Sequence, residues 1–266
     1  MPTASEIRVV AKEVDRIFTL NGLSCCLVGG GGCVLYGCTR TPSDVDIVVM
    51  TQSHTQESLK EMLVHHDHHF YTRASKQIGA TWRVLFYTLP ETLYSRHRKR
   101  WCKVDILTPG TMNIPHIDPP LIKRISGLPV MPLLPLLLLK LQAWDDHRTS
   151  LRADFRQKQY VDVSDVKKLV GVARVRGEHI RDAQTELGLP GSFVEAGKVR
   201  VRVFVSLMGV EDGCAEDWAA IGLFGEVSTG RDESATRLSL RLRATRRLGE
   251  RGESDELMYR FRSMRL

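Results

Sequence analysis

Four consecutive glycines, residues 29–32, restrict what the first part of this chain can form. They follow the apolar stretch Ser-Cys-Cys-Leu-Val and precede Cys-Val-Leu-Tyr-Gly. Glycine has no β-carbon and weakens the interior of a regular element, so a run of four is typical of a turn. The segment therefore predicts a short buried strand over residues 24–30, ended by the glycines, and a helix that begins at residue 33.

The elements around this segment alternate between helices and strands. An apolar stripe at helical spacing predicts a first helix over residues 4–21, with Ser5 as its N-cap. The later predicted elements are, in order, a strand over 43–50, a helix over 55–66, and two hairpin strands over 81–89 and 100–108. This order predicts an α/β (α+β) fold, a mixed sheet with flanking helices.

The second half of the chain has a different sequence pattern, a proline-rich segment followed by helical periodicity. Seven prolines between residues 109 and 135 predict an irregular connection. Helical patterns follow over 133–148, 161–174 and 177–188. We therefore expect an α/β domain over residues 1–110 and a helical domain over 120–200. Residues 201–266 are left uncertain, and nine arginines between 237 and 265 predict a partly flexible, solvated tail there.

Composition adds a location and a class of partner. The formal charge of +7 and the pI near 9.2 favour acidic partners such as nucleotides or nucleic acid. Six cysteines without zinc-type spacing, and an acid-containing N-terminus without a signal peptide, predict an intracellular, cytoplasmic protein. The most apolar window, from Val130, is too short to span a bilayer, so no membrane partner is expected.

Three aspartates are placed to act together. Residues i and i+2 of a strand share a face about 6.5–7 Å apart, so Asp44 and Asp46 project together. Trp101, Lys103 and Asp105 share one face of the later strand in the same way. If the two strands are neighbours, three carboxylates converge and need a cation. A pair of Mg²⁺ ions (or Mn²⁺) about 3.5–4 Å apart, bridging a polyphosphate, would neutralise them.

The glycines suggest a phosphate site beside this cluster. A strand that ends in Gly29 and Gly30 before a helix presents backbone N–H groups to an anion. Arg40 lies between the glycines and the aspartates and could contact phosphate. The P-loop pattern GxxxxGK[ST] and the dinucleotide pattern GxGxxG are both absent at these glycines.

Taken together, Val-Gly-Gly (28–30), Asp-Val-Asp-Ile (44–47) and Val-Asp-Ile-Leu (104–107) resemble the nucleotidyltransferase superfamily that includes DNA polymerase β. Within it, the run from Leu27 to Val49 looks most like minimal nucleotidyltransferases related to the AbiEii toxin type. The resemblance implies a nucleotidyltransferase fold in which Asp44, Asp46 and Asp105 bind the metals and are catalytic. It also implies that Gly29 and Gly30 seat the phosphates of the nucleotide.

The resemblance extends into the helical half through a lysine on an apolar helix and a later Asp-x-x-Asp stretch. Lys140, Arg148, Asp162 and Asp165 occupy these positions, although Val161 stands where the family has lysine. Lys140 and Asp162 would then bind nucleotide. Other interpretations stay open, because Lys140 can extend to water or meet an anion, and the two aspartates can simply favour a helix N-terminus. The resemblance covers about residues 20–170.

Two further segments allow more than one interpretation. Histidines 65, 66, 68 and 69 could hold a metal or simply favour a helix end. The basic loop at residues 95–100 could follow a nucleic-acid backbone or be solvated.

The leading hypothesis is metal-dependent transfer of a nucleoside monophosphate from an NTP to an unknown acceptor, RNA, protein or small molecule, with release of pyrophosphate. The alternatives are a non-catalytic nucleotide- or RNA-binding protein that retains the fold, and an interaction scaffold.

Overall fold

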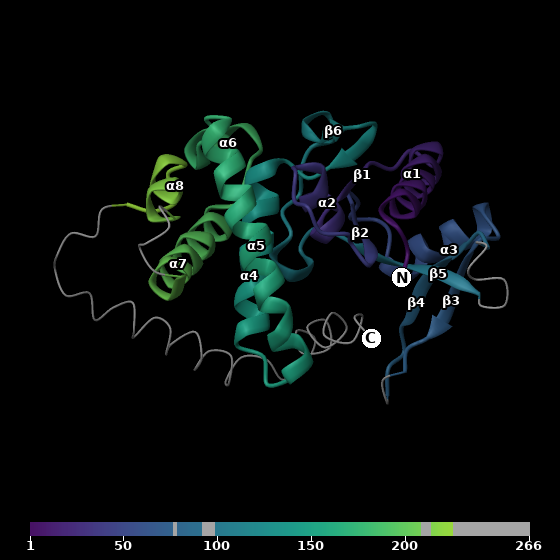
Figure 1. Ribbon diagram of the computed structural model, residues 1–266. Helices are drawn as coiled ribbons and strands as arrows, with labels where there is room; N and C mark the ends of the chain where they lie inside the picture. Colours follow the sequence, from purple (N-terminus) through teal and green to yellow (C-terminus); the bar gives the residue numbers. More distant parts are fainter. Residues whose placement is uncertain (77–78, 92–98, 209–213, 226–266) are drawn as a thin grey trace. The chain divides into compact units, whose positions relative to one another are not determined.

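The computed structural model describes residues 1–76, 79–91, 99–208 and 214–225 (Figure 1). The described residues of 1–73 and 83–224 belong to one compact unit, which contains every site discussed below. Residues 74–76, 79–82 and 225 belong to a second unit, in which the backbone N–H of Ser75 donates to the carbonyl of Trp82. The predicted basic loop lies mostly outside the described residues, and the arginine-rich tail lies wholly outside them.

A seven-stranded mixed sheet is formed by the described residues, in the order β3-β4-β5-β2-β1-β7-β6. The strands are β1 (Cys25–Leu27), β2 (Asp44–Val49), β3 (Phe70–Ala74), β4 (Arg83–Leu89), β5 (Arg100–Leu107), β6 (Lys123–Ile125) and β7 (Leu128–Val130). β2 and β5 are parallel neighbours, and Asp46 pairs with Asp105 in their register. β4 and β5 are antiparallel, as predicted for the hairpin. The predicted fold class, a mixed sheet with flanking helices, is confirmed.

Helices α1 (Ala4–Leu20) and α3 (Gln56–His66) pack against each other and against the sheet (Figure 1). The apolar stripe of α1 is buried, as its spacing predicts. Its N-cap is Thr3 rather than the predicted Ser5. Thr3 accepts from the Glu6 N–H while the Glu6 carboxylate accepts from the Thr3 N–H, which completes a capping box that Ser5 cannot form.

The glycine run belongs to a helix rather than to a turn before one. Helix α2 (Gly29–Leu35) begins directly after the extended N-cap Val28, so the prediction of a helix starting at residue 33 was wrong. Glycine costs about 1 kcal/mol relative to alanine within a helix. The structure shows a reason for it at Gly32, where a β-carbon would lie 3.2 Å from both the Leu136 side chain and the Leu27 carbonyl. The glycines thus let α2 approach its neighbours closely.

The proline-rich connection contains regular structure that the sequence analysis missed. β6 and β7 form a hairpin around Ser126 and Gly127, whose positive φ angles of 52° and 78° are those of a two-residue turn of type I′. β7 then pairs in parallel with β1. Pro129 lies within β7 but adopts a strand conformation without donating a hydrogen bond, and so the proline count misled the prediction.

The second half is helical, as predicted. Its helices are α4 (Leu133–Arg148), α5 (Ala153–Val175), α6 (Ile180–Glu186), α7 (Gly191–Met208) and α8 (Cys214–Ala220). α4 matches its predicted range, whereas α5 begins at Ala153 rather than at residue 161. α7 extends beyond residue 200, where the sequence analysis ends the helical domain. The limits of the two domains stay a prediction. Across the described ranges, no helix has both the length and the apolar character required to cross a bilayer.

Candidate functional site

The three predicted carboxylates lie together at the centre of the sheet. Asp44 and Asp46 come from β2 and Asp105 from β5, and one ligand atom of each lies within 4.8 Å of the others. Asp46 and Asp105 are each 3% exposed, while Asp44 is half-buried. The parallel register places Asp46 directly beside Asp105, which confirms the predicted convergence of the three side chains. We call Asp44, Asp46 and Asp105 the carboxylate trio.

A lysine that the sequence analysis did not select completes this cluster. Lys103 pairs with Asp44 in the β2–β5 register, and its Nζ lies 2.8 Å from Asp105 Oδ2. The signal was available, because Lys103 lies two residues before Asp105 on the same strand face. The buried ammonium of Lys103 offsets part of the negative charge of the three carboxylates. The remaining negative charge affects the neighbouring thiol of Cys102. Burial, with a further contribution from the three carboxylates, raises the pKa of Cys102 to about 12.

The donor atoms of the trio suit a hard divalent cation. All three ligands are carboxylate oxygens, the donors that Mg²⁺ and Mn²⁺ favour. Three carboxylates and one ammonium leave a local charge of about −2, which a divalent cation would neutralise. The residues present therefore fit the metal site that the family resemblance implies.

Gly29 and Gly30 are required because two site side chains lie against them. Gly29 has a φ of 53°, and a β-carbon there would overlap the Asp46 carboxylate. A β-carbon on Gly30 would lie 2.5 Å from Arg40 Nη2. The first turn of α2 is thus in contact with the carboxylate trio on one side and with a guanidinium on the other. The role of these glycines in seating phosphate stays a prediction.

Next to α2, a network of ion pairs connects Arg40, in the first half of the chain, with helices α4 and α5 in the second half. Arg40 Nε donates to both carboxylate oxygens of Asp165, at 2.9 and 3.2 Å. Lys140 Nζ lies 3.0 Å from Asp165 Oδ2 and 2.6 Å from Asp162 Oδ1, and His147 Nδ1 is paired with Asp162 Oδ2. We call these five residues the ion-pair network.

This network decides between the interpretations of Lys140 and Asp162. Lys140 is 5% exposed, so its ammonium meets anions instead of extending to water. Asp162 and Asp165 lie in the middle of α5, so the interpretation that they favour a helix N-terminus was wrong. Burial opposes the ionised form of both groups, but their attraction outweighs it. The pKa of Asp162 is lowered by His147 and Lys140, and the pKa of Lys140 is raised by Asp162.

The membership of the network differs from the sequence prediction at two neighbouring positions of α4. Arg148, which the resemblance pointed to, pairs instead with Asp145 and lies over the Trp144 ring. His147 takes the position beside Asp162. The spacing contained this signal, since Lys140 and His147 are seven residues apart and therefore lie on one face of α4.

The histidine segment lies elsewhere in the molecule. His65 and His66 end α3, where a helix dipole favours cations. Asp67, His68 and His69 have ligand atoms within 4.8 Å of one another, and the His69 ring stacks on Tyr87 of β4 at 5.5 Å. Tyr87 points away from the strand face that carries Phe86 and Lys103, because strand residues alternate. The segment is therefore no part of the carboxylate trio.

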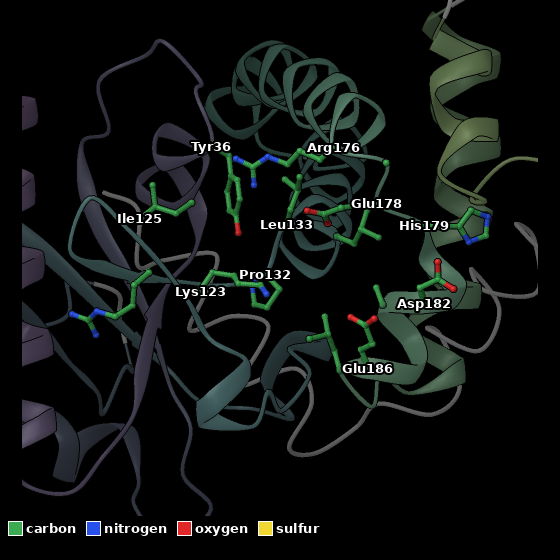
Figure 2. A pocket seen from close by; sticks show the side chains of 15 residues that line it. Tyr36, Lys123, Ile125, Pro132, Leu133, Arg176, Glu178, His179, Asp182 and Glu186 are labelled. Atoms are coloured by element: carbon green, nitrogen blue, oxygen red, sulfur yellow. The ribbon is translucent and has the colours of Figure 1, made fainter.

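A cavity of about 510 Å³ opens at the other end of α2 (Figure 2). Figure 2 shows Tyr36 and Arg176 beside one another on its wall, and the Arg176 guanidinium lies 5.2 Å from the centre of the Tyr36 ring. Burial raises the pKa of Glu178, which also lines the cavity. None of the predicted site residues line it. The cavity is therefore a hollow separate from the proposed catalytic residues.

Comparison with solved structures supports the assignment of the fold. An antigenic nucleotidyltransferase-like protein from Paracoccidioides brasiliensis aligns with a TM-score of 0.59 at 14% identity, over 85% of this chain and 96% of the other. A Helicobacter pylori protein provisionally described as a nucleotidyltransferase aligns at a TM-score of 0.46 and 12% identity, over 92% and 95% of the two chains. Helicobacter pylori JHP933 aligns at 0.39 and 13%, over 91% and 97%.

The first alignment shows that the chain shares the fold of that nucleotidyltransferase-like protein. The TM-scores of the other two alignments lie below 0.5 and are too low to assign a fold. No protein-family model matches the sequence, and no curated protein matches it.

Proposed function

We propose that this protein is a metal-dependent nucleotidyltransferase that moves a nucleoside monophosphate from an NTP to an acceptor hydroxyl. The observation that carries the proposal is the carboxylate trio, whose ligand atoms meet within 4.8 Å on two adjacent parallel strands. The nucleotidyltransferase-like fold supports it at the level of reaction class. In the reaction, a bond forms between the acceptor oxygen and the α-phosphorus, and the bond to the departing pyrophosphate breaks. The acceptor hydroxyl, activated with the help of Asp105, gives up its proton to solvent.

The carboxylate trio would hold the divalent cations. When bound, these ions would supply neutralisation of the triphosphate and a lower pKa for the attacking hydroxyl. Lys103 would stabilise the negative charge of Asp105 through its 2.8 Å contact. The protein contributes positioning and charge stabilisation, without a covalent intermediate.

Arg40 would connect the ion-pair network to the nucleotide. Its Nε is engaged with Asp165, and its Nη2 lies over Gly30, beside the turn that contacts Asp46. A triphosphate next to Gly29 and Gly30 would meet this guanidinium directly. Lys140 and Asp162 would then act as positioning residues, since Lys140 shares Asp165 with Arg40. These roles are our proposal for the residues that the AbiEii-type resemblance matches in the helical half of the chain.

The test is a labelling experiment with the full chain. The protein is incubated with each of the four NTPs, labelled in the α- or the γ-phosphate, with Mg²⁺ or Mn²⁺ and either total RNA or cell extract. We expect label from the α-phosphate to enter a macromolecule or small acceptor while pyrophosphate is released. Transfer of the γ-label would contradict the proposed reaction. Calorimetric binding of Mg-NTP without turnover on any acceptor would instead favour the non-catalytic nucleotide binder.

A further inference from the structure

A row of aromatic side chains extends from the carboxylate trio across the sheet. The Phe86 and Trp101 rings meet edge to face at 4.9 Å between centroids, and the Tyr71 ring stacks on Phe86 at 5.7 Å. The guanidinium of Arg73 lies 5.1 Å from the Tyr71 centroid and 5.5 Å from the Phe86 centroid. We call Tyr71, Phe86 and Trp101, with Arg73, the aromatic row.

The aromatic row and the trio lie on the same face of the sheet. Trp101, Lys103 and Asp105 occupy every second position of β5 and therefore share one face of the sheet. Phe86 of the neighbouring strand β4 pairs with Lys103 and lies on the same face. Lys103 in turn pairs with Asp44, so Asp44, Lys103 and Phe86 stand in line across three strands. Neighbouring strands are about 4.8 Å apart, which puts the row about 10 Å from Asp44.

Helices α1 and α3 lie on the opposite face of these strands. Arg100, next to Trp101 on β5, points to the other side and pairs with Glu6 of α1 at 2.7 Å. His69, just after α3, stacks on Tyr87, which alternates with Phe86. Figure 1 shows α1 and α3 along the same side of β4 and β5. On the face with the row, Trp101 is 44% exposed, Arg73 is exposed and Tyr71 is half-buried, while Phe86 is buried between them and supports the two outer rings.

We propose that the aromatic row binds the unpaired end of a single-stranded nucleic acid and that this strand is the acceptor of the transferred nucleotide. The proposal rests on the proposed function. Accessible aromatic rings on a sheet face, here Trp101 and Tyr71, stack with bases of any sequence, and arginine adds attraction to phosphate. The chain's net charge of +7 agrees with a polyanionic partner. A strand stacked on the row would end at the trio, where its terminal hydroxyl must lie.

Tryptophan fluorescence can test the proposal without nucleotide or metal. The chain has four tryptophans, and Trp82, Trp144 and Trp218 are buried while Trp101 is exposed. The full chain is titrated with 12-nucleotide single-stranded RNA, single-stranded DNA and double-stranded RNA. We expect saturable quenching by single strands, because a base stacks on Trp101. RNA bound elsewhere, for example by the arginines of residues 237–265, would leave the emission of Trp101 unchanged.

Three variants make the test specific. Trp101→Phe should abolish the quenching but change the affinity, measured by anisotropy of labelled RNA, by less than about threefold, since phenylalanine also stacks. Trp101→Ala and Tyr71→Ala should each weaken binding about 5- to 100-fold, which corresponds to the loss of one stacked base. Tyr160→Ala, an exposed aromatic of α5 outside the row, is the matched control and should change nothing.

The outcomes separate this proposal from the proposed function. The aromatic row would be overturned as a nucleic-acid site if no single strand quenched the fluorescence, or if the wild type and Trp101→Ala bound RNA with equal affinity. The row would then be a candidate binding site for a protein partner. Nucleotide transfer to another acceptor would then still support the enzyme. Quenching and weakened binding as expected, with no transfer to the bound strand, would overturn the acceptor assignment alone, because transfer to a protein or a small molecule would still support the enzyme.

Discussion

In the Asp44→Asn/Asp46→Asn variant we expect nucleotide transfer to fall by at least about 10³-fold. Asparagine keeps the shape of each side chain but removes two of the three negative charges that meet within 4.8 Å. The cluster would no longer bind divalent cations tightly enough to neutralise a triphosphate. Initial rates of α-phosphate transfer at saturating NTP, over a range of Mg²⁺ concentrations, measure the effect.

Stability measurements distinguish this loss of function from misfolding. Three carboxylates so close together repel one another, so the variant should unfold at the same temperature as the wild type, or higher, without metal. Any stabilisation of the wild type by Mn²⁺ should disappear in the variant. The matched control is Asp118→Asn/Asp154→Asn, which removes two exposed aspartates that lie outside the trio. Transfer within about threefold of the wild type in the Asp44→Asn/Asp46→Asn variant would contradict a role for these carboxylates.

The second large effect concerns stability. Replacing Lys140 by methionine should lower the free energy of unfolding by about 3 kcal/mol at neutral pH, because Asp162 and Asp165 would lose a buried cation. Methionine preserves most of the side-chain volume, so a cavity would contribute little. Lys12→Met, which removes an exposed lysine of α1, should change the same free energy by less than about 0.5 kcal/mol. Urea unfolding followed by circular dichroism measures both.

The pH dependence gives this prediction a second measure. The folded pKa of Asp162 is lowered from its usual 3.8, so the folded state binds fewer protons than the unfolded state in the acid range. The stability that Asp162 contributes is therefore complete above about pH 4 and is lost as the pH falls through its folded pKa. In Lys140→Met the pKa of Asp162 lies nearer to its usual value, and the loss below pH 4 should be smaller. An equally steep acid loss in both proteins would contradict the coupling of Lys140 to Asp162.

The carboxylate trio could be anticipated from sequence because strand alternation is a local rule. Once Asp44, Asp46 and Asp105 are placed on strands, their faces follow, and only the neighbouring of β2 and β5 had to be assumed. α4 was predicted to its last residue because its apolar run ends in charged residues. Both successes rest on signals that lie within a single strand or helix.

The ion-pair network depends on contacts between distant segments and was only partly predictable. Arg40 and Asp165 are separated by 125 positions, and their pairing follows from how α4 packs against both α2 and α5. The start of α5 was misplaced because its first turns are polar, so no apolar periodicity marks them. The β6–β7 hairpin was hidden by Pro129, whose tolerance at that position depends on the sheet around it. Packing decided each of these features.

The most direct test of the account is a crystal structure of the full chain with Mn²⁺ and a non-hydrolysable NTP, with the metal located by anomalous scattering. We expect Mn²⁺ to be coordinated by carboxylate oxygens of Asp44, Asp46 and Asp105, and the triphosphate to lie against Gly29 and Gly30, within reach of Arg40. Mn²⁺ away from the carboxylate trio, or a triphosphate bound in the separate cavity beside Tyr36 and Arg176, would contradict it.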